Sequence, residues 1–135
     1  MAPDTPAELL QLTYRADLDL LVGRWTHEPD PALLPAAYQQ LARAAEASNC
    51  RYWLQDIRRR VVNDPAITRW LLTEFMPNMA RRLGGVRVAY LTSPALLAHI
   101  MAAPEFKSVE HYAGKPYQVN FFGDEGAAVA WLFGV

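Results

Sequence analysis

The chain has 135 residues, a formal net charge of −1, 52% hydrophobic residues and 20% charged residues. This length is typical of one domain, and this balance is typical of a globular protein and excludes a disordered one. A net charge so close to zero gives no support to binding of nucleic acid or of an acidic membrane surface.

Apolar periodicity, prolines and glycines divide the chain into alternating strands and helices. After a disordered leader over residues 1–8, two apolar runs joined by Ala16 and Asp17 predict an antiparallel hairpin. The start of the first long helix stays open between Pro31 and Pro35, because Pro35 would remove a hydrogen bond from an established helix. The predicted elements are strands 9–15 and 18–25, a helix ending near 48, strand 51–57, helix 65–83, strand 86–91, helix 94–103, strand 117–122 and a final helix opened by residue 124, with 105–116 irregular.

Two helices carry a capping residue followed by proline at the first helical position, Asp64-Pro65 and Ser93-Pro94. Gly84-Gly85 predicts the end of the helix that begins at Pro65, and Pro77 predicts a kink in its last third. These signals give the predicted boundaries between the strands and the helices.

The element order β-β-α-β-α-β-α-β-α predicts a single α/β domain over residues 9–135. We expect a mixed, mostly parallel five-stranded sheet with helices, in which the opening hairpin supplies the antiparallel member. Ligands of open α/β sheets collect outside the carboxyl ends of the parallel strands. That topology, and not a motif, selects nine candidate binding residues: Asp56, Arg58, Arg59, Arg60, Asn63, Asp64, Thr92, Ser93 and Asp124.

The chemistry of this edge depends on its helix starts. Carboxylate caps at Asp64 and Asp124 would use the N–H groups that bind phosphate and would repel an anion. Only the start at Thr92 and Ser93 stays open to an anion, with the arginines as helpers. Residues 58–60 either recognise a phosphate or carboxylate on a partner or form a solvated loop whose charges point to different sides.

No catalytic or metal-binding template fits the chain. A phosphoacceptor receiver domain needs a lysine after the last strand, whereas Lys115 precedes it. His27, His99 and His111 have no metal-ligand spacing, and there is no nucleophile elbow or glycine-rich phosphate loop. We therefore predict no enzymatic activity, no metal and no cofactor.

The single cysteine, Cys50, excludes an internal disulfide and is expected to be a small buried residue.

No apolar run approaches the roughly 20 residues of a membrane span. We expect a cytoplasmic protein without stable membrane insertion and without nucleic acid as a partner. The four tryptophans, Trp25, Trp53, Trp70 and Trp131, form core or line a pocket for a small apolar ligand.

Three segments, Cys50–Asp56 with the arginines at 58–60, Val86–Pro94 and Tyr117–Phe122, resemble the STAS-like (SpoIIAA-like) proteins of bacteria. With the hairpin and the last helix, the resemblance extends over about residues 10–132. It implies a mixed sheet covered by helices and a non-enzymatic regulatory or protein-binding module, with a protein partner or a homodimer.

The anti-anti-sigma members of that family carry a phosphorylatable serine or threonine at the start of the helix after the central strand. The matching position here holds Asn63, Asp64 and Pro65, and Thr68 lies about a turn inside the helix. No obvious switch hydroxyl is therefore present.

STAS-like folds also resemble CRAL-TRIO-type lipid binders, so a small apolar ligand or lipid is the alternative. A binding module predicts an exposed apolar patch beside the 58–64 junction, a carrier predicts an enclosed pocket lined by Trp and Phe, and an enzyme predicts a cleft with shifted pKa values.

Overall fold

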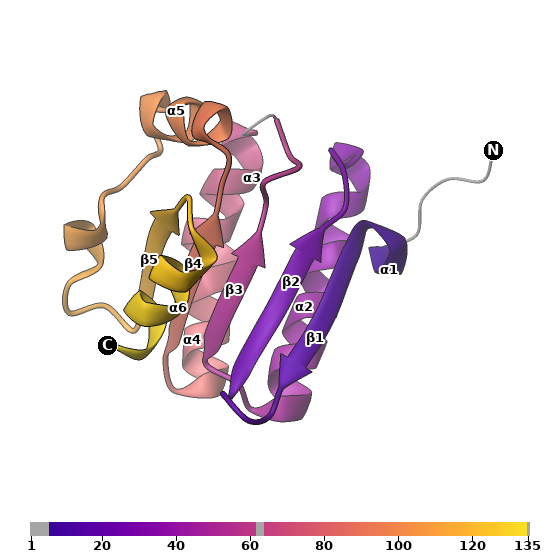
Figure 1. Cartoon of the computed structure of the whole chain (residues 1–135), viewed down its shortest axis with the longest axis vertical. Helices are drawn as coiled ribbons and strands as arrows, with labels where there is room; N and C mark the ends of the chain where they lie inside the picture. The colour runs from indigo at the N-terminus through magenta and orange to yellow at the C-terminus, as the bar shows by residue number, and fades with distance from the viewer. Residues whose placement is uncertain (1–5, 62–63, 135) are drawn as a thin grey trace.

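Five strands form one sheet in the order β1-β2-β3-β4-β5 (Figure 1). The structure is a computed structural model and describes residues 6–61 and 64–134. β1 pairs antiparallel with β2, and all other neighbours are parallel, which confirms the predicted mixed, mostly parallel sheet. The strands are β1 (Leu10–Arg15), β2 (Leu20–Trp25), β3 (Tyr52–Asp56), β4 (Val86–Leu91) and β5 (Tyr117–Phe122).

Helices cover both faces of the sheet unequally. On one face lie α2 (Leu34–Ser48) and a long helical run made of α3 (Pro65–Trp70), the π-helical turn η2 (Leu71–Phe75) and α4 (Met76–Leu83). Of the described helices, α6 (Glu125–Phe133) is the one that packs on the other face. β2, β3, β4 and β5 contribute side chains to both cores, because successive residues of a strand point to opposite faces.

The fifth helix does not cover either face. In Figure 1, α5 (Pro94–Ala102) lies beyond the carboxyl ends of the strands. The segment after α5 packs against β5 instead. It contains the 3₁₀ turn η3 (Val109–Tyr112). A pocket lies between this segment, α5, the long helical run and the sheet. None of the described helices is long and apolar enough to cross a membrane.

The opening of the chain differs from its prediction. Pro6–Leu9 forms a short helix, α1, where we predicted the end of a disordered leader and the first residue of a strand. This end of the chain is held by Thr26, whose Oγ1 donates to the Glu8 carbonyl and whose N–H donates to the Leu9 carbonyl. Leu9 is fully buried, so the hydrophobic effect anchors the helix.

The hairpin is confirmed, but its two-residue turn at Ala16 and Asp17 is wrong. The strands end at Arg15 and resume at Leu20, which leaves a four-residue connection. Asp19 adopts a left-handed backbone with φ of 52°, and its carboxylate accepts a hydrogen bond from the Tyr14 hydroxyl at 2.8 Å. This local bond favours the longer turn.

The helix starts follow the capping signals. Pro31 opens a 3₁₀ turn, η1 (Pro31–Leu33), and α2 begins at Leu34, so that both proline signals are used. The helix in which we predicted a kink at Pro77 is not one α-helical run. It widens into the π turn η2 directly before α4, and Pro77 is the second residue of α4.

Candidate functional site

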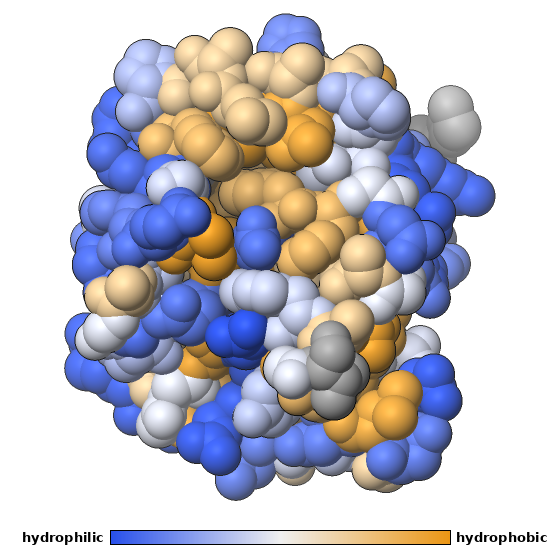
Figure 2. All heavy atoms as spheres, turned by 60° about the vertical axis from the view of Figure 1, so that its left-hand side comes forward, coloured by the Kyte–Doolittle hydropathy of each residue, from blue (hydrophilic) through white to orange (hydrophobic). Residues whose placement is uncertain are grey.

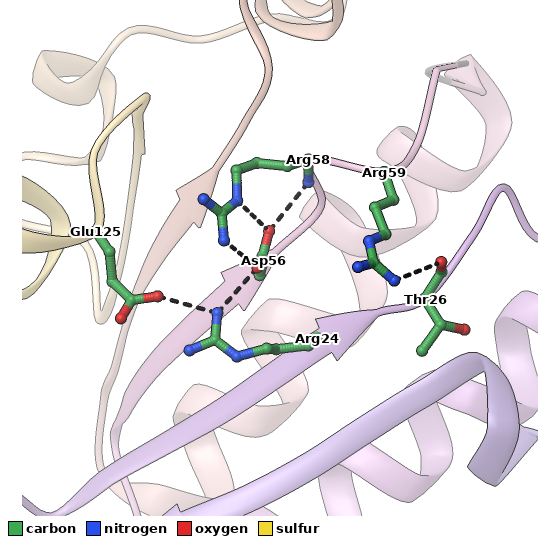
Figure 3. A network of polar contacts seen from close by, with 6 residues as sticks. All are labelled: Arg24, Thr26, Asp56, Arg58, Arg59 and Glu125. Atoms are coloured by element: carbon green, nitrogen blue, oxygen red, sulfur yellow. Dashed lines mark hydrogen bonds and ion pairs between the residues drawn. The ribbon is translucent and has the colours of Figure 1, made fainter.

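Charged side chains converge where β2 and β3 end, on the face that carries α6 (Figure 3). Arg58 holds the Asp56 carboxylate with two bonds, Nε to Oδ1 at 3.0 Å and Nη2 to Oδ2 at 2.8 Å. Arg24 donates from Nη1 to Asp56 Oδ2 at 2.9 Å and to Glu125 Oε1 at 3.0 Å. We call these four residues, together with Arg59, the polar edge.

Asp56 is the centre of the polar edge. Burial on its own would raise the pKa of this carboxyl, but hydrogen bonds from Arg58 and Arg24 outweigh burial and lower the pKa below its ordinary value. The carboxylate is therefore ionised at neutral pH and already carries two arginine partners. The polar edge connects β2, β3 and α6, and two of its arginines, Arg24 and Arg58, are already paired with carboxylates of the chain itself.

The three consecutive arginines point in three directions. Arg58 joins Asp56, and Arg59 is exposed and donates to the Thr26 carbonyl at 3.4 Å (Figure 3). Arg60 is 8% exposed, and its guanidinium lies 5.2 Å from the centroid of the Trp25 ring. The three side chains thus point to different sides, as the second of the two readings of the sequence states. In addition, the Arg60 side chain points into the interior of the protein.

The remaining candidate residues do not converge on one site. Three of them cap helices: Asp64 Oδ1 accepts from Ala66 N–H at 2.9 Å, Ser93 Oγ from Leu96 N–H at 3.2 Å and Asp124 Oδ2 from Ala127 N–H at 2.8 Å. Thr92 is buried, and its N–H donates to the Phe122 carbonyl. The α5 start, which the sequence left open to an anion, is therefore capped by Ser93. Asn63 lies outside the described residues.

An apolar pocket of about 80 Å³ lies on the opposite face of the sheet from α6. Its floor is formed by β4 and β5, and its walls by the long helical run, by α5 and by the segment after α5. The lining residues are Tyr38, Ile57, Arg60, Asp64, Ile67, Thr68, Leu71, Leu72, Met76, Tyr90, Leu96, Ile100, Glu105, Phe106, Lys107, Tyr112, Val119 and Phe121. In Figure 2, apolar side chains gather in the upper part of the face shown, at the height of α5, between hydrophilic flanks.

Among the polar residues that line the pocket, Tyr38, Tyr90 and Arg60 interact with one another. Burial raises the pKa of Tyr38, while hydrogen bonds from Arg60 and Tyr90 oppose that rise. Burial also raises the pKa of Tyr90 well above its ordinary value, and its hydrogen bond to Tyr38 adds to the rise. Tyr38, Tyr90 and Arg60 thus form one polar cluster at the pocket. Both hydroxyls remain protonated at neutral pH.

Two charged groups at the pocket lack a full set of partners. The Nε of Arg60 is buried and has no hydrogen-bond partner among the described residues. Glu105 pairs with Arg69 at 3.7 Å through Oε1, whereas its Oε2 is buried and has no hydrogen-bond partner in the described part of the chain. An unsatisfied buried charge destabilises a fold, so such groups usually mark a place where a ligand or water completes the bonding.

The sequence reading missed most of the pocket. Arg60 and Asp64 were named from topology, but Tyr38 and Tyr90 read as core positions of a helix and a strand, and Glu105 and Phe106 lie in a segment that read as irregular. No tryptophan lines this pocket; its aromatic walls are tyrosine and phenylalanine. Trp25 and Trp53 are core residues. Among the described residues, no group of His, Cys, Asp and Glu could hold a metal ion.

No protein-family model matches the chain, and no curated protein matches it. Its function is therefore inferred from the geometry of the pocket and of the polar edge.

Proposed function

We propose that this chain is a small-molecule-binding domain whose ligand occupies the apolar pocket between β4, β5 and the long helical run. The observation that carries the proposal is the combination of apolar walls with a few converging polar groups, Arg60, Tyr38, Tyr90 and Glu105. That combination is typical of ligand sites, in which apolar surface supplies affinity and a small number of polar groups fixes orientation.

The volume of the pocket limits what can enter. Pockets for drug-sized molecules span roughly 300–1,000 Å³, whereas this one holds about 80 Å³. The space is therefore suited to a compact ligand, or to the end of a longer one that leaves through the mouth. A fully enclosed long acyl chain does not fit the volume, which favours a small ligand over a lipid carrier.

The tyrosines support binding in preference to acid–base catalysis. The pKa values of Tyr38 and Tyr90 are both raised by burial. A general base needs a pKa near the operating pH so that it is deprotonated when it acts. Protonated phenols instead act as hydrogen-bond donors that orient a ligand.

Native mass spectrometry of freshly purified protein, followed by thermal unfolding with small apolar probes such as benzyl alcohol and benzoate, tests the proposal. We expect a co-purifying small mass or a rise in the unfolding temperature with at least one probe. Leu72→Trp places a bulky side chain in the pocket wall and should abolish that rise. Met101→Trp, on the exposed side of α5 and outside the pocket, is the matched control and should keep it.

An unchanged unfolding temperature with every probe and no co-purifying mass would count against a ligand pocket. Equal responses of Leu72→Trp and Met101→Trp would place the ligand elsewhere.

The STAS-like assignment, the regulatory or protein-binding role and the bacterial, cytoplasmic setting stay predictions. One observation favours the protein-binding role: Val61 is 64% exposed beside the exposed Arg58 and Arg59, at the junction where an apolar patch was expected. A dimer in the same native mass spectrum that Val61→Ser converts to a monomer would support that role. A monomer in both variants would argue against a homodimer through this surface.

A further inference from the structure

Arg60 is a buried cation that forms no ion pair with another described residue. It is 8% exposed, and none of the ion pairs among the described residues includes it. Its neighbours are the Trp25 ring and the Tyr38 hydroxyl, both neutral. The aromatic ring attracts the cation over its face and so replaces part of the hydration energy that burial removes. The ring carries no negative charge, however.

Arg60 lines the pocket, and one of its donor atoms is buried without a partner among the described residues. This donor is the Nε–H of the guanidinium. Because a guanidinium presents its N–H groups as a rigid fork, a free Nε–H suits a carboxylate, which can accept from Nε and from a neighbouring Nη at once. The protonated Tyr38 hydroxyl lines the same pocket, so this wall offers a second hydrogen-bond donor.

The structure therefore points to a ligand of defined chemistry. We propose that the pocket binds a compact apolar carboxylate, a short-chain or aromatic acid, whose carboxylate pairs with Arg60 while its apolar body lies among the leucines, isoleucines and phenylalanines of the walls. This inference rests on the proposed function, and it adds the anionic group and the residue that selects it.

Glu105 limits the orientation of such a ligand. Its carboxylate also borders the pocket and repels an anion, although Arg69 lies 3.7 Å from Oε1. Two cations line the pocket, and the acid group is directed to Arg60 because Arg60 is buried whereas Lys107 is exposed. The unpartnered Oε2 of Glu105 prefers a ligand that also carries a donor, such as a hydroxyl, over a second acidic group.

Isothermal titration calorimetry with pairs of matched probes tests the inference. Benzoate is compared with benzamide, and isovalerate with isovaleramide, on the full chain at neutral pH. We expect each acid to bind at least about tenfold more tightly than its amide, because charge-assisted hydrogen bonds are roughly twice as strong as neutral ones. This comparison uses the unaltered protein and does not depend on the folding of any variant.

A pair of arginine variants then assigns the charge. Arg60→Met should weaken benzoate binding at least about tenfold and leave benzamide binding little changed. Arg59→Met is the matched control, since Arg59 is the adjacent residue, is exposed and contacts a backbone carbonyl instead of the pocket. It should leave both affinities unchanged, and circular dichroism checks that both variants fold.

The outcomes separate the two proposals. Equal affinities for acid and amide would overturn the role of the anionic group and leave the ligand pocket standing. Binding of benzoate that survives Arg60→Met would overturn the role of Arg60. Absence of binding by all four probes would overturn both proposals. Palmitate that displaces benzoate and binds more tightly would overturn the compact ligand in favour of a lipid.

Discussion

The side chain of Gln55 lies directly against the backbone of Gly23 on the neighbouring strand. A Cβ atom at position 23 would approach Gln55 Nε2 to 2.7 Å and its Cδ to 3.2 Å. Gln55 is completely buried, and its Oε1 accepts from the Trp25 indole at 3.1 Å. The glycine thus makes room for a buried amide that positions Trp25, the ring on which Arg60 rests.

Gly23→Ala is expected to destabilise the fold by about 1–3 kcal/mol, because overpacking forces the buried amide to move from its bond with Trp25. Urea denaturation followed by tryptophan fluorescence measures the change. Gly123→Ala is the control, since a Cβ at that position meets nothing within 4 Å and should change stability little. Equal effects of the two substitutions would show that Gln55 accommodates the extra methyl without cost.

Much of the sheet could be predicted because its signals are local. The strands are short apolar runs, and Asp64, Ser93 and Asp124 each cap a helix as their types and positions indicate. Boundaries were less predictable, since α1 and the hairpin turn depend on bonds made by Thr26 and Asp19. Such contacts are invisible to periodicity.

The candidate site was only partly predictable, for a geometric reason. Alternation along a strand would place Arg60 on the same face as Asp56 and Arg58. The chain turns after β3, with Arg60 N–H donating to the Ile57 carbonyl at 3.0 Å, and the alternation ends there. Tyr38, Tyr90 and Glu105 reach the same pocket from distant parts of the sequence, and only the packing of α2, β4 and the segment after α5 brings them together.

Asp56→Asn should destabilise the protein by about 1–2 kcal/mol at neutral pH. It removes a carboxylate that holds two arginines, although both arginines are partly exposed and recover some hydration. Because folding lowers the pKa of Asp56, its contribution is full above the ordinary aspartate pKa of about 4 and is lost as pH falls through the folded value. The gap in stability between Asp56→Asn and the unaltered chain should therefore shrink in acid.

Denaturant titrations at neutral pH and near pH 3 measure this gap. Glu125→Gln is the comparison, because Glu125 contacts the same Arg24 from an exposed position and should cost less than about 1 kcal/mol. A gap for Asp56→Asn that stays constant between the two pH values would contradict the ionised carboxylate as its source.

Cys50 should react slowly with a thiol reagent in the folded protein. It is fully buried, its Sγ donates towards the Tyr52 carbonyl at 3.2 Å, and burial raises the pKa of the thiol, so the reactive thiolate is scarce at neutral pH. The rate of reaction with Ellman's reagent, measured with and without denaturant, checks this. We expect the folded rate to be at least about a hundredfold lower; comparable rates would place the thiol at the surface.

Arg60→Met should leave the unliganded protein as stable as before or make it more stable. Replacing a buried charge that forms no ion pair with another described residue by an apolar side chain of similar length removes a desolvation penalty, and the flexible thioether can still pack on Trp25. Sites built for function often sacrifice stability in this way. Thermal and urea unfolding of the unliganded variant measure the change. A loss of more than about 2 kcal/mol would instead make Arg60 a structural residue of the Trp25 and Tyr38 cluster, whose bonds hold the fold with or without a ligand.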